Sequence, residues 1–284
     1  MNSSRVVHLP MTVGMADAAL LASFQAWQAM RAFSPATIRR RRSSLRLFGA
    51  HIAPLRLGQA TTDDVEDFLS TRRAPRTRHA YRSDLAAFFR WAMKRALVDA
   101  NPVLDVDTIR VPRSLPRPVD PALIPFLITS ATDPDTQLMV ALAACAGLRR
   151  SEIAALASDD LSLHSDPPVL VVRDGKGAKD RVVPLHPILV TLLRRRRVDG
   201  PLFELSPDSI YRRIAGHLAT HGIDATPHQL RHTFGSELAR TTHGNLILIG
   251  RLMGHADTDT TKGYIGWAGG EGSGAVAAMF DGAA

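Results

Sequence analysis

Apolar residues recur every three to four positions through the first part of the chain, a spacing typical of amphipathic helices. This spacing predicts four helices, over residues 19–30, 35–51, 62–69 and 77–97. Two of them start with helix-capping chemistry, because Ser34 stands before Pro35 and threonine precedes an acidic turn at residues 61–64. We therefore predict a small all-helical domain over residues 16–103, after an N-terminal extension of residues 1–15.

Prolines separate this helical region from the rest of the chain. They are Pro102, Pro112, Pro116, Pro118 and Pro121. Proline lacks an amide donor and disfavours helix in the residue before it, so the segment is predicted to be extended. We place a linker at residues 104–120 and a second domain at residues 121–265.

The second domain combines helical spacing with two short β-rich segments. Helical patterns cover residues 121–130, 133–146, 187–197 and 245–253, and a further helix starts at Thr226 and Pro227. Residues 168–172 and 181–185 flank a glycine-containing tip, which predicts a hairpin. The predicted fold is mainly α with a small β-sheet, a helical domain followed by an α+β domain.

Composition narrows the class of protein. The chain has 284 residues, 45% of them hydrophobic, enough to bury the core of one large or two modest domains. Its one cysteine, Cys145, excludes an internal disulfide and a multi-cysteine metal site. The chain lacks a long apolar run and a signal-peptide pattern, so we expect a cytoplasmic protein without a membrane partner. We expect no metal or other cofactor, because metal-ligand spacing of histidines is absent.

Charge is distributed unevenly along the chain. The net charge is +8, but residues 1–118 hold 19 Lys and Arg against 9 Asp and Glu, a balance of +10. Residues 119–284 hold 16 basic against 18 acidic residues, a balance of −2. A strongly basic half indicates a polyanion partner, usually nucleic acid, and the alternative is a solvated basic surface.

Two groups of arginines are candidates for contact with DNA phosphates. The first lies in the helix over residues 35–51 and comprises Arg39, Arg40, Arg41 and Arg42. The second lies around the start of the fourth helix and comprises Arg72, Arg73, Arg76, Arg78 and Arg82. A helix N-terminus also favours phosphate, because its free amide groups point at the anion.

Two motifs in the second half carry the candidate chemistry. Residues 146–153 read Ala-Gly-Leu-Arg-Arg-Ser-Glu-Ile, and residues 227–234 read Pro-His-Gln-Leu-Arg-His-Thr-Phe. Leu-Met-Gly-His follows at residues 252–255, and Tyr264 stands nine residues beyond His255. In this order and with these flanks, the motifs resemble the tyrosine recombinase (phage integrase) family over residues 16–264. The resemblance implies an N-terminal helical core DNA-binding domain and a catalytic domain.

Several of these residues suit a phosphate site by their own chemistry. The planar fork of Arg149 can give two hydrogen bonds to a phosphate, and Glu152, three residues later, can orient it. His228 and Arg231 are three residues apart at a helix start, so they share one face. His228 can shuttle protons or only donate a hydrogen bond, and both readings stay open.

The resemblance implies a role for each position of the family motif. Tyr264 is the nucleophile, and Lys176 is the general acid, with Lys179 as the alternative. The groups that hold charge on the phosphate are Arg149, His228, Arg231 and His255. The implied product is a 3′-phosphotyrosyl enzyme, formed without ATP or a metal ion.

The resemblance also implies partners. Double-stranded DNA with specific core sites is the expected substrate, and a monomer in solution is expected to form a homotetramer on two duplexes, through a Holliday junction. Directionality or DNA-bending proteins are further expected partners. Integrase and dimer resolvase stay open as subtypes. The alternatives are a type IB topoisomerase and a catalytically silent DNA-binding protein, and the complete catalytic set favours an enzyme.

The two ends of the chain differ from many family members. About 15 residues precede the helical domain, which predicts a compact two-domain form without an arm-binding domain. Residues 266–284 combine a glycine-rich stretch with a short apolar segment. They are expected either to dock on a neighbouring protomer or to stay flexible.

Overall fold

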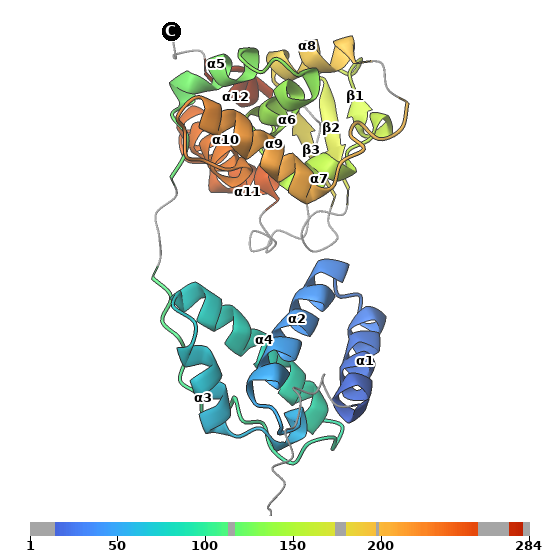
Figure 1. Ribbon diagram of the computed structural model, residues 1–284. Helices are drawn as coiled ribbons and strands as arrows, with labels where there is room; N and C mark the ends of the chain where they lie inside the picture. The colour runs from blue at the N-terminus through green and yellow to red at the C-terminus, as the bar shows by residue number, and fades with distance from the viewer. Residues whose placement is uncertain (1–14, 113–116, 174–179, 197–198, 255–272, 281–284) are drawn as a thin grey trace, which may run out of the picture. The chain divides into compact units, whose positions relative to one another are not determined.

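The computed structural model describes residues 15–112, 117–173, 180–196, 199–254 and 273–280. The chain divides into two compact units, Met1–Ser114 and Leu115–Ala284 (Figure 1). The described residues are mostly helical, with one three-stranded sheet in the second unit. The predicted fold class, mainly α with a small β-sheet, is confirmed. None of the described helices combines the length and apolar content needed to cross a membrane.

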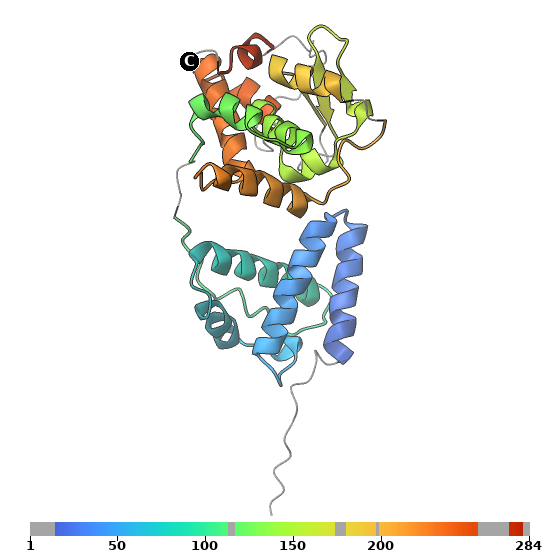
Figure 2. The ribbon, with the colours of Figure 1, turned by 45° about the horizontal axis from the view of Figure 1, so that its top comes forward.

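The first unit is all helical. Its elements are α1 (Met15–Met30), α2 (Pro35–His51), the 3-10 turn η1 (Leu57–Gln59), α3 (Thr62–Ser70) and α4 (Pro75–Met93). Helices α1 and α2 lie side by side, and α4 packs against both, with α3 on α4 (Figure 2). Helix α4 ends before the predicted residue 97, because Ala96 adopts a φ of 52° and Leu97 N–H donates to Ala92 O at 3.0 Å. That reversal ends the helix.

Aromatic rings form the core of the first unit. The rings of Phe24 and Phe88 lie 5.4 Å apart, and those of Phe48 and Phe68 lie 5.3 Å apart, both edge to face. Edge-to-face pairs are favourable because the positive ring edge meets the negative face of its neighbour. Helix α4 supplies both Phe88 and Phe89, so it joins the rings of α1 to those of α2 and α3.

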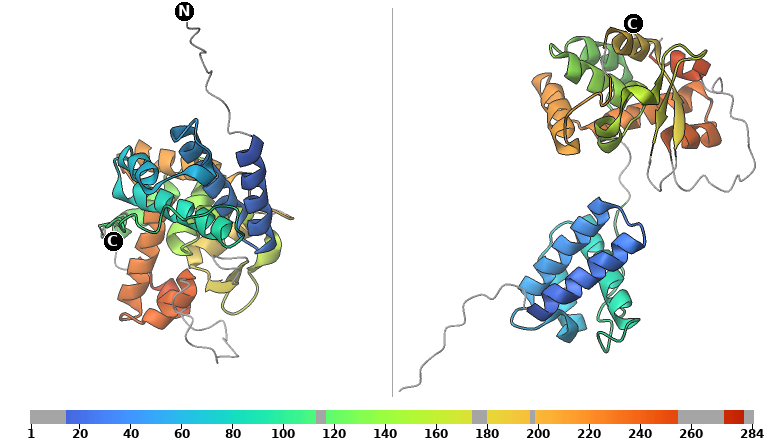
Figure 3. Two further views of the ribbon diagram at one scale, coloured as in Figure 1. Left: turned by 90° about the horizontal axis from the view of Figure 1, so that it is seen from below. Right: turned by 90° about the vertical axis from the view of Figure 1, so that its right-hand side faces the viewer.

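The second unit places helices around a small antiparallel sheet. Its elements are η2 (Pro121–Leu123), α5 (Ile124–Thr129), α6 (Pro134–Cys145), α7 (Arg150–Ala155), η3 (Ser158–Asp160), β1 (Leu161–Ser162), β2 (Val169–Val172), β3 (Arg181–Pro184), α8 (Pro187–Arg195), α9 (Pro207–Thr220), α10 (Pro227–Thr241), α11 (Leu246–Met253) and α12 (Ser273–Ala277). The three strands lie side by side in the order β1-β2-β3 (Figure 3). Val172 lies opposite Arg181. The predicted hairpin corresponds to β2 and β3. Strand β1 was not predicted, because two residues are too short to show a period.

Helix α6 is the centre of the second unit. Every residue from Leu138 to Cys145 is buried, and α10 runs along this helix while α5, α7, α8 and α9 also contact it. Alanines 141, 143 and 144 let these neighbours approach closely because their side chains are small. Cys145 is a buried member of this core, and burial raises the pKa of its thiol to about 12.

Residues 273–280 pack against their own unit. Val276 and Met279 are fully buried, α12 contacts α10, and His186 Nε2 lies 3.1 Å from Met279 O. The ring of Phe280 meets the ring of His186 edge to face. This packing differs from the flexible tail that the glycine-rich composition predicted, because the apolar side chains after the glycines fill space in the core.

The turn between α6 and α7 depends on Gly147. Its φ is 61°, and a Cβ added there would lie 2.3 Å from Cδ1 of Phe234, a fully buried ring. We expect Gly147→Ala to lower the free energy of unfolding by about 2–4 kcal/mol, from overpacking and the left-handed backbone. Urea unfolding followed by circular dichroism measures the change.

Gly216→Ala is the matched control for that substitution. Gly216 is exposed on α9, and an added Cβ meets nothing within 4 Å. It is expected to stabilise the chain by about 0.5–1 kcal/mol, because alanine is the better helix former. An unfolding midpoint for Gly147→Ala equal to that of wild type would contradict this account of the turn.

Candidate active site

The start of α7 holds Arg149 against Glu152. Arg149 follows closely on the end of α6, as predicted, and caps α7 with an extended backbone. Glu152 Oε2 accepts from the backbone N–H of Arg149 at 2.8 Å, and Oε1 accepts from Arg149 Nη1 at 2.6 Å. Arg149 Nη2 donates to Gly254 O at 3.2 Å. The predicted orientation of the Arg149 guanidinium by Glu152 is therefore present.

Arg231 is the buried arginine of this site. It lies on α10, is 3% exposed, and donates through Nη1 to Gly147 O and through Nη2 to Met253 O. Burial, together with the positive charges of Arg149 and Arg181, lowers its pKa to about 9. These two carbonyl contacts fix the guanidinium beside Arg149.

Arg181 is a further member of the site that the sequence reasoning missed. It is the first residue of β3, and it donates through Nη1 and Nη2 to the two oxygens of Glu152, at 2.9 Å and 2.7 Å. Its Nε donates to Leu252 O at 3.0 Å. A charged residue at the start of an otherwise apolar strand was the only signal for it, and nothing local indicates its partner.

The cluster carries more positive than negative charge. Among the described residues, Glu152 is the carboxylate that pairs with Arg149 and Arg181, and its negative charge also acts on the nearby guanidinium of Arg231. Three cations beside one anion leave a surplus of positive charge where the surroundings are poorly solvated. A site of this kind favours an anionic ligand.

His228 stands on the first turn of α10, near the two catalytic-motif arginines. Its ring lies 4.3 Å from the ring of His232. Burial lowers its pKa, and the charges of His232, Arg231 and Arg149 lower it further. The imidazole is therefore neutral at neutral pH and able to accept a proton.

Four predicted site residues, Lys176, Lys179, His255 and Tyr264, lie outside the residues that the structure describes. The described residues adjoin two of them, because Asp180 follows Lys179 and Gly254 precedes His255. Helix α11 ends at Met253, and Gly254 caps it with a φ of 62°, as its glycine predicted.

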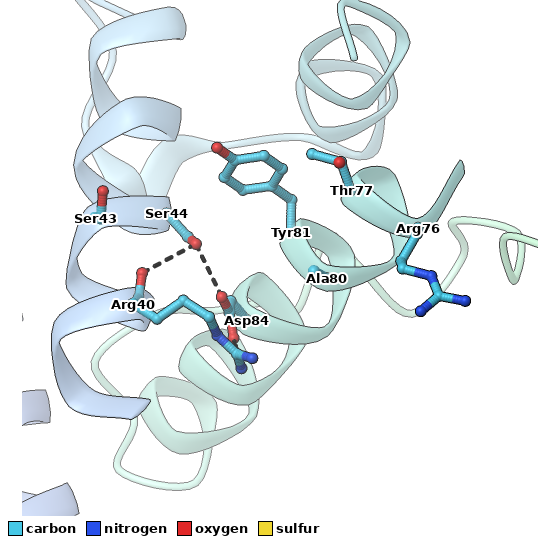
Figure 4. A pocket seen from close by; sticks show the side chains of 8 residues that line it. All are labelled: Arg40, Ser43, Ser44, Arg76, Thr77, Ala80, Tyr81 and Asp84. Atoms are coloured by element: carbon cyan, nitrogen blue, oxygen red, sulfur yellow. Dashed lines mark hydrogen bonds and ion pairs between the residues drawn. The ribbon is translucent and has the colours of Figure 1, made fainter. Parts of the chain in front are cut away.

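Helix α2 of the first unit pairs two of its arginines with residues of α1 and α4. Arg40 Nη2 donates to Asp84 Oδ1 at 2.7 Å, and Ser44 Oγ donates to Asp84 Oδ2 at 2.8 Å (Figure 4). Arg41 Nη1 donates to Gln28 Oε1 at 3.0 Å. Arg40 and Arg41 therefore have partners within the unit, although the Arg40 side chain stays 57% exposed.

The outward arginines of α2 form a separate stripe. Arg39 and Arg42 line a surface groove together with Arg46 and Leu47. The spacing of the three arginines places them on one face of the helix. We call Arg39, Arg42 and Arg46 the outer stripe.

Two arginines of the second candidate group also have partners within the unit. Arg82 donates through Nη2 to Val106 O at 2.7 Å, and the guanidinium of Arg72 lies 4.5 Å from the centre of the Phe68 ring. Arg76 lines the same pocket as Asp84 (Figure 4). Two members of the predicted group around the start of α4, Arg72 and Arg82, therefore make contacts that stabilise their own unit.

Comparison with known families identifies the chain. Residues 120–268 match the phage integrase family, and residues 22–96 match the SAM-like N-terminal domain of phage integrases. The chain belongs to the phage integrase family. The predicted family is therefore confirmed.

Curated relatives of this phage integrase family member are tyrosine recombinases. Tyrosine recombinase XerC of Alcanivorax borkumensis is 33% identical over 207 residues, which cover 64% of this chain and 66% of that protein. Tyrosine recombinase XerD of Pseudomonas putida is 31% identical over 255 residues, covering 78% of this chain and 84% of that protein. The predicted enzyme class, a tyrosine site-specific recombinase, is confirmed.

Solved structures of integrases share the fold of this family member. A lambda integrase dimer bound to a COC′ core site matches with a TM-score of 0.67 at 17% identity, over 88% of this chain and 98% of that one. The Tn1549 transposon integrase in complex with a circular intermediate DNA matches with a TM-score of 0.64 at 15% identity, over 85% and 92%. At these identities, the likeness concerns the fold.

Ionised Glu152 stabilises this tyrosine recombinase. Burial opposes its ionisation, but the hydrogen bonds and charge of Arg181, with the hydrogen bonds of Arg149, lower its pKa from 4.5 to about 2. A lowered folded-state pKa gives stability that is fully present above pH 4.5 and is lost as pH falls toward about 2. The contribution is on the order of 3 kcal/mol.

We expect Glu152→Gln to remove that part of the acid dependence. The free energy of unfolding of the variant should stay flatter than that of wild type between about pH 4.5 and about pH 2. Urea titrations at several pH values measure this, with Asp208→Asn as the control, because Asp208 is an exposed carboxylate of the same unit. Equal acid slopes for wild type and Glu152→Gln would refute the assignment.

Proposed function

We propose that this chain performs site-specific DNA recombination by cleaving and rejoining DNA through a 3′-phosphotyrosyl intermediate. The observation that carries the proposal is the pairing of Arg149 and Arg181 with the carboxylate of Glu152, with the buried Arg231 beside them. The surplus positive charge of this cluster can bind the negative charge of one phosphodiester. The reaction serves either integration and excision of a mobile element or the resolution of dimers.

The two motif arginines are proposed to hold the scissile phosphate. Arg231 is fixed by the carbonyls of Gly147 and Met253, and Arg149 is fixed on one side by Glu152. Donors that are fixed before the substrate arrives stabilise charge on the non-bridging oxygens without reorganising, an effect worth about 3–4 kcal/mol for one donor. His255 is proposed to add a further donor.

The proposed chemistry exchanges one phosphodiester bond for another. The Tyr264 oxygen forms a bond to phosphorus, and the bond from phosphorus to the 5′ oxygen breaks. The neutral imidazole of His228 suits the role of taking the phenol proton, and Lys176, with Lys179 as the alternative, protonates the leaving 5′ oxygen. Attack by a 5′ hydroxyl of the partner duplex reverses these steps, so neither ATP nor a metal ion is needed.

The proposed partner is double-stranded DNA with specific core sites. The lambda and Tn1549 integrases were solved bound to DNA, and we extend that partner to this chain. The arginines of the first unit, above all its outer stripe, are proposed to contact the backbone. A homotetramer on two duplexes, with accessory proteins for direction or bending, completes the proposal.

Covalent capture tests the proposed nucleophile. The full chain is mixed with nicked genomic DNA fragments, adducts are trapped by denaturation, and the attached DNA is sequenced. Wild type is expected to give adducts at one sequence, and Tyr264→Phe to give none, because the variant lacks the attacking oxygen.

Tyr211→Phe is the matched control for capture. Tyr211 is a surface residue of α9 that stacks with Arg150. Adducts that persist in Tyr264→Phe would refute the nucleophile, and adducts scattered without sequence preference would favour a topoisomerase. A wild-type chain that forms no adduct would contradict the proposed reaction.

The outer stripe predicts the salt dependence of DNA binding. Replacing Arg39 and Arg42 by glutamine should reduce the slope of log affinity against log salt by about 2, because each contacted phosphate contributes about 0.9. Binding titrations on one duplex from low to physiological salt measure the slope. Arg41→Gln is the control on the same helix, since Arg41 is 15% exposed and contacts Gln28. An unchanged slope in the double variant would rule out phosphate contact by the stripe.

A further inference from the structure

Arg181 is a buried arginine for which the family motif assigns no role. Its side chain is 7% exposed, and all three of its nitrogens donate, two to Glu152 and one to Leu252 O. Its neighbour in the sheet is Val172. A buried ion pair is by itself weak evidence that the fold is stabilised. The presence of a buried guanidinium in this otherwise apolar strand therefore calls for an explanation other than stability.

Glu152 is saturated by donors. Oε1 accepts from Arg149 Nη1 and Arg181 Nη1, and Oε2 accepts from the backbone N–H of Arg149 and from Arg181 Nη2. Arg149 therefore reaches Glu152 through one nitrogen of its fork. Its second nitrogen, Nη2, is directed to Gly254 O at 3.2 Å instead.

Arg181 competes with Arg149 for the same carboxylate. A carboxylate freed from Arg181 would present both oxygens to the nearest cation, and Arg149 forms bidentate pairs readily because its fork matches that geometry. Such a pair would turn both terminal nitrogens of Arg149 to Glu152 and cancel its charge. Arg181 prevents this by occupying one acceptor position on each oxygen.

Arg181 also joins three separate segments of the second unit. It belongs to β3, pairs with Glu152 of α7 and bonds to the last turn of α11 through Leu252 O. Gly254 lies so close to it that an added Cβ would be 3.0 Å from Arg181 Nη1. Arg181 thus links the Arg149 turn to the end of α11, as Arg149 and Arg231 also do.

We infer that Arg181 is a positioning residue for DNA cleavage, which occupies Glu152 so that Nη2 of Arg149 stays out of the carboxylate pair and can donate to the scissile phosphate. The inference rests on the proposed function. It assigns Arg181 no contact with the DNA, so its effect passes through Arg149.

The test is the single-turnover rate of covalent adduct formation by the full chain on nicked genomic DNA fragments. Arg181→Met is expected to slow adduct formation about 100-fold, comparable with the loss of one preorganised donor. The affinity for the same DNA should change by less than about threefold, because most contacts of such proteins are made to other phosphates. Arg173→Met is the matched control, since Arg173 pairs with Asp160 at the end of β2 and is 59% exposed.

A second substitution separates positioning from simple support of the fold. Adding Glu152→Gln to Arg181→Met should raise the rate about 10-fold over Arg181→Met alone, because the carboxylate that captures Arg149 has been removed. In the wild-type background the same Glu152→Gln should lower the rate, because Arg149 then loses its orienting carboxylate. A double variant no faster than Arg181→Met would overturn the inference.

Arg181→Lys keeps the inference testable if Arg181→Met does not fold. Lysine retains the charge but lacks the fork, so the rate is expected to fall about 10-fold in a folded chain. If wild type forms Tyr264-dependent adducts and either Arg181→Lys or folded Arg181→Met forms them at the wild-type rate, the inference is overturned. Absence of adducts from wild type would instead reject the proposed function itself.

Discussion

The pairing of one buried carboxylate with two arginines organises the catalytic unit. Glu152 lies at a point where α7 and β3 meet, and its two oxygens accept four hydrogen bonds from Arg149 and Arg181. Ionised groups in a poorly solvated interior are costly unless each is paired, so these side chains hold one another in place. With Arg231 beside them, the surplus charge is left for a ligand rather than neutralised by the protein.

Backbone carbonyls complete this arrangement. Arg149, Arg181 and Arg231 each donate to a carbonyl in the last turn of α11 or directly after it, at residues 252–254. The final carbonyls of a helix have no partner within the helix, and cations are favoured at that end. The end of α11 therefore supplies the acceptors that orient all three guanidiniums, which links the arginines to the segment that leads to His255 and Tyr264.

A buried carboxylate that accepts from an arginine is also present in the first unit. Asp84 is 1% exposed on α4, and it accepts from Arg40 and Ser44 of α2. This carboxylate binds Arg40, whose side chain stays 57% exposed, while Arg39 and Arg42 line a separate surface groove. In both units, a buried acid pairs with an arginine from a second element.

The amino-acid sequence by itself determined the family, most of the helical elements and the motif residues of this protein. Helix periods, caps and the glycine stop at Gly254 are local properties, and the order of the motifs is read directly from the chain. The pairing of Arg181 with Glu152 spans 29 residues, and that of Arg40 with Asp84 spans 44, so neither leaves a local signal. Only the tertiary structure decided which arginines pair with a buried acid, because that choice depends on which carboxylate the packing of distant helices and strands brings within hydrogen-bonding distance.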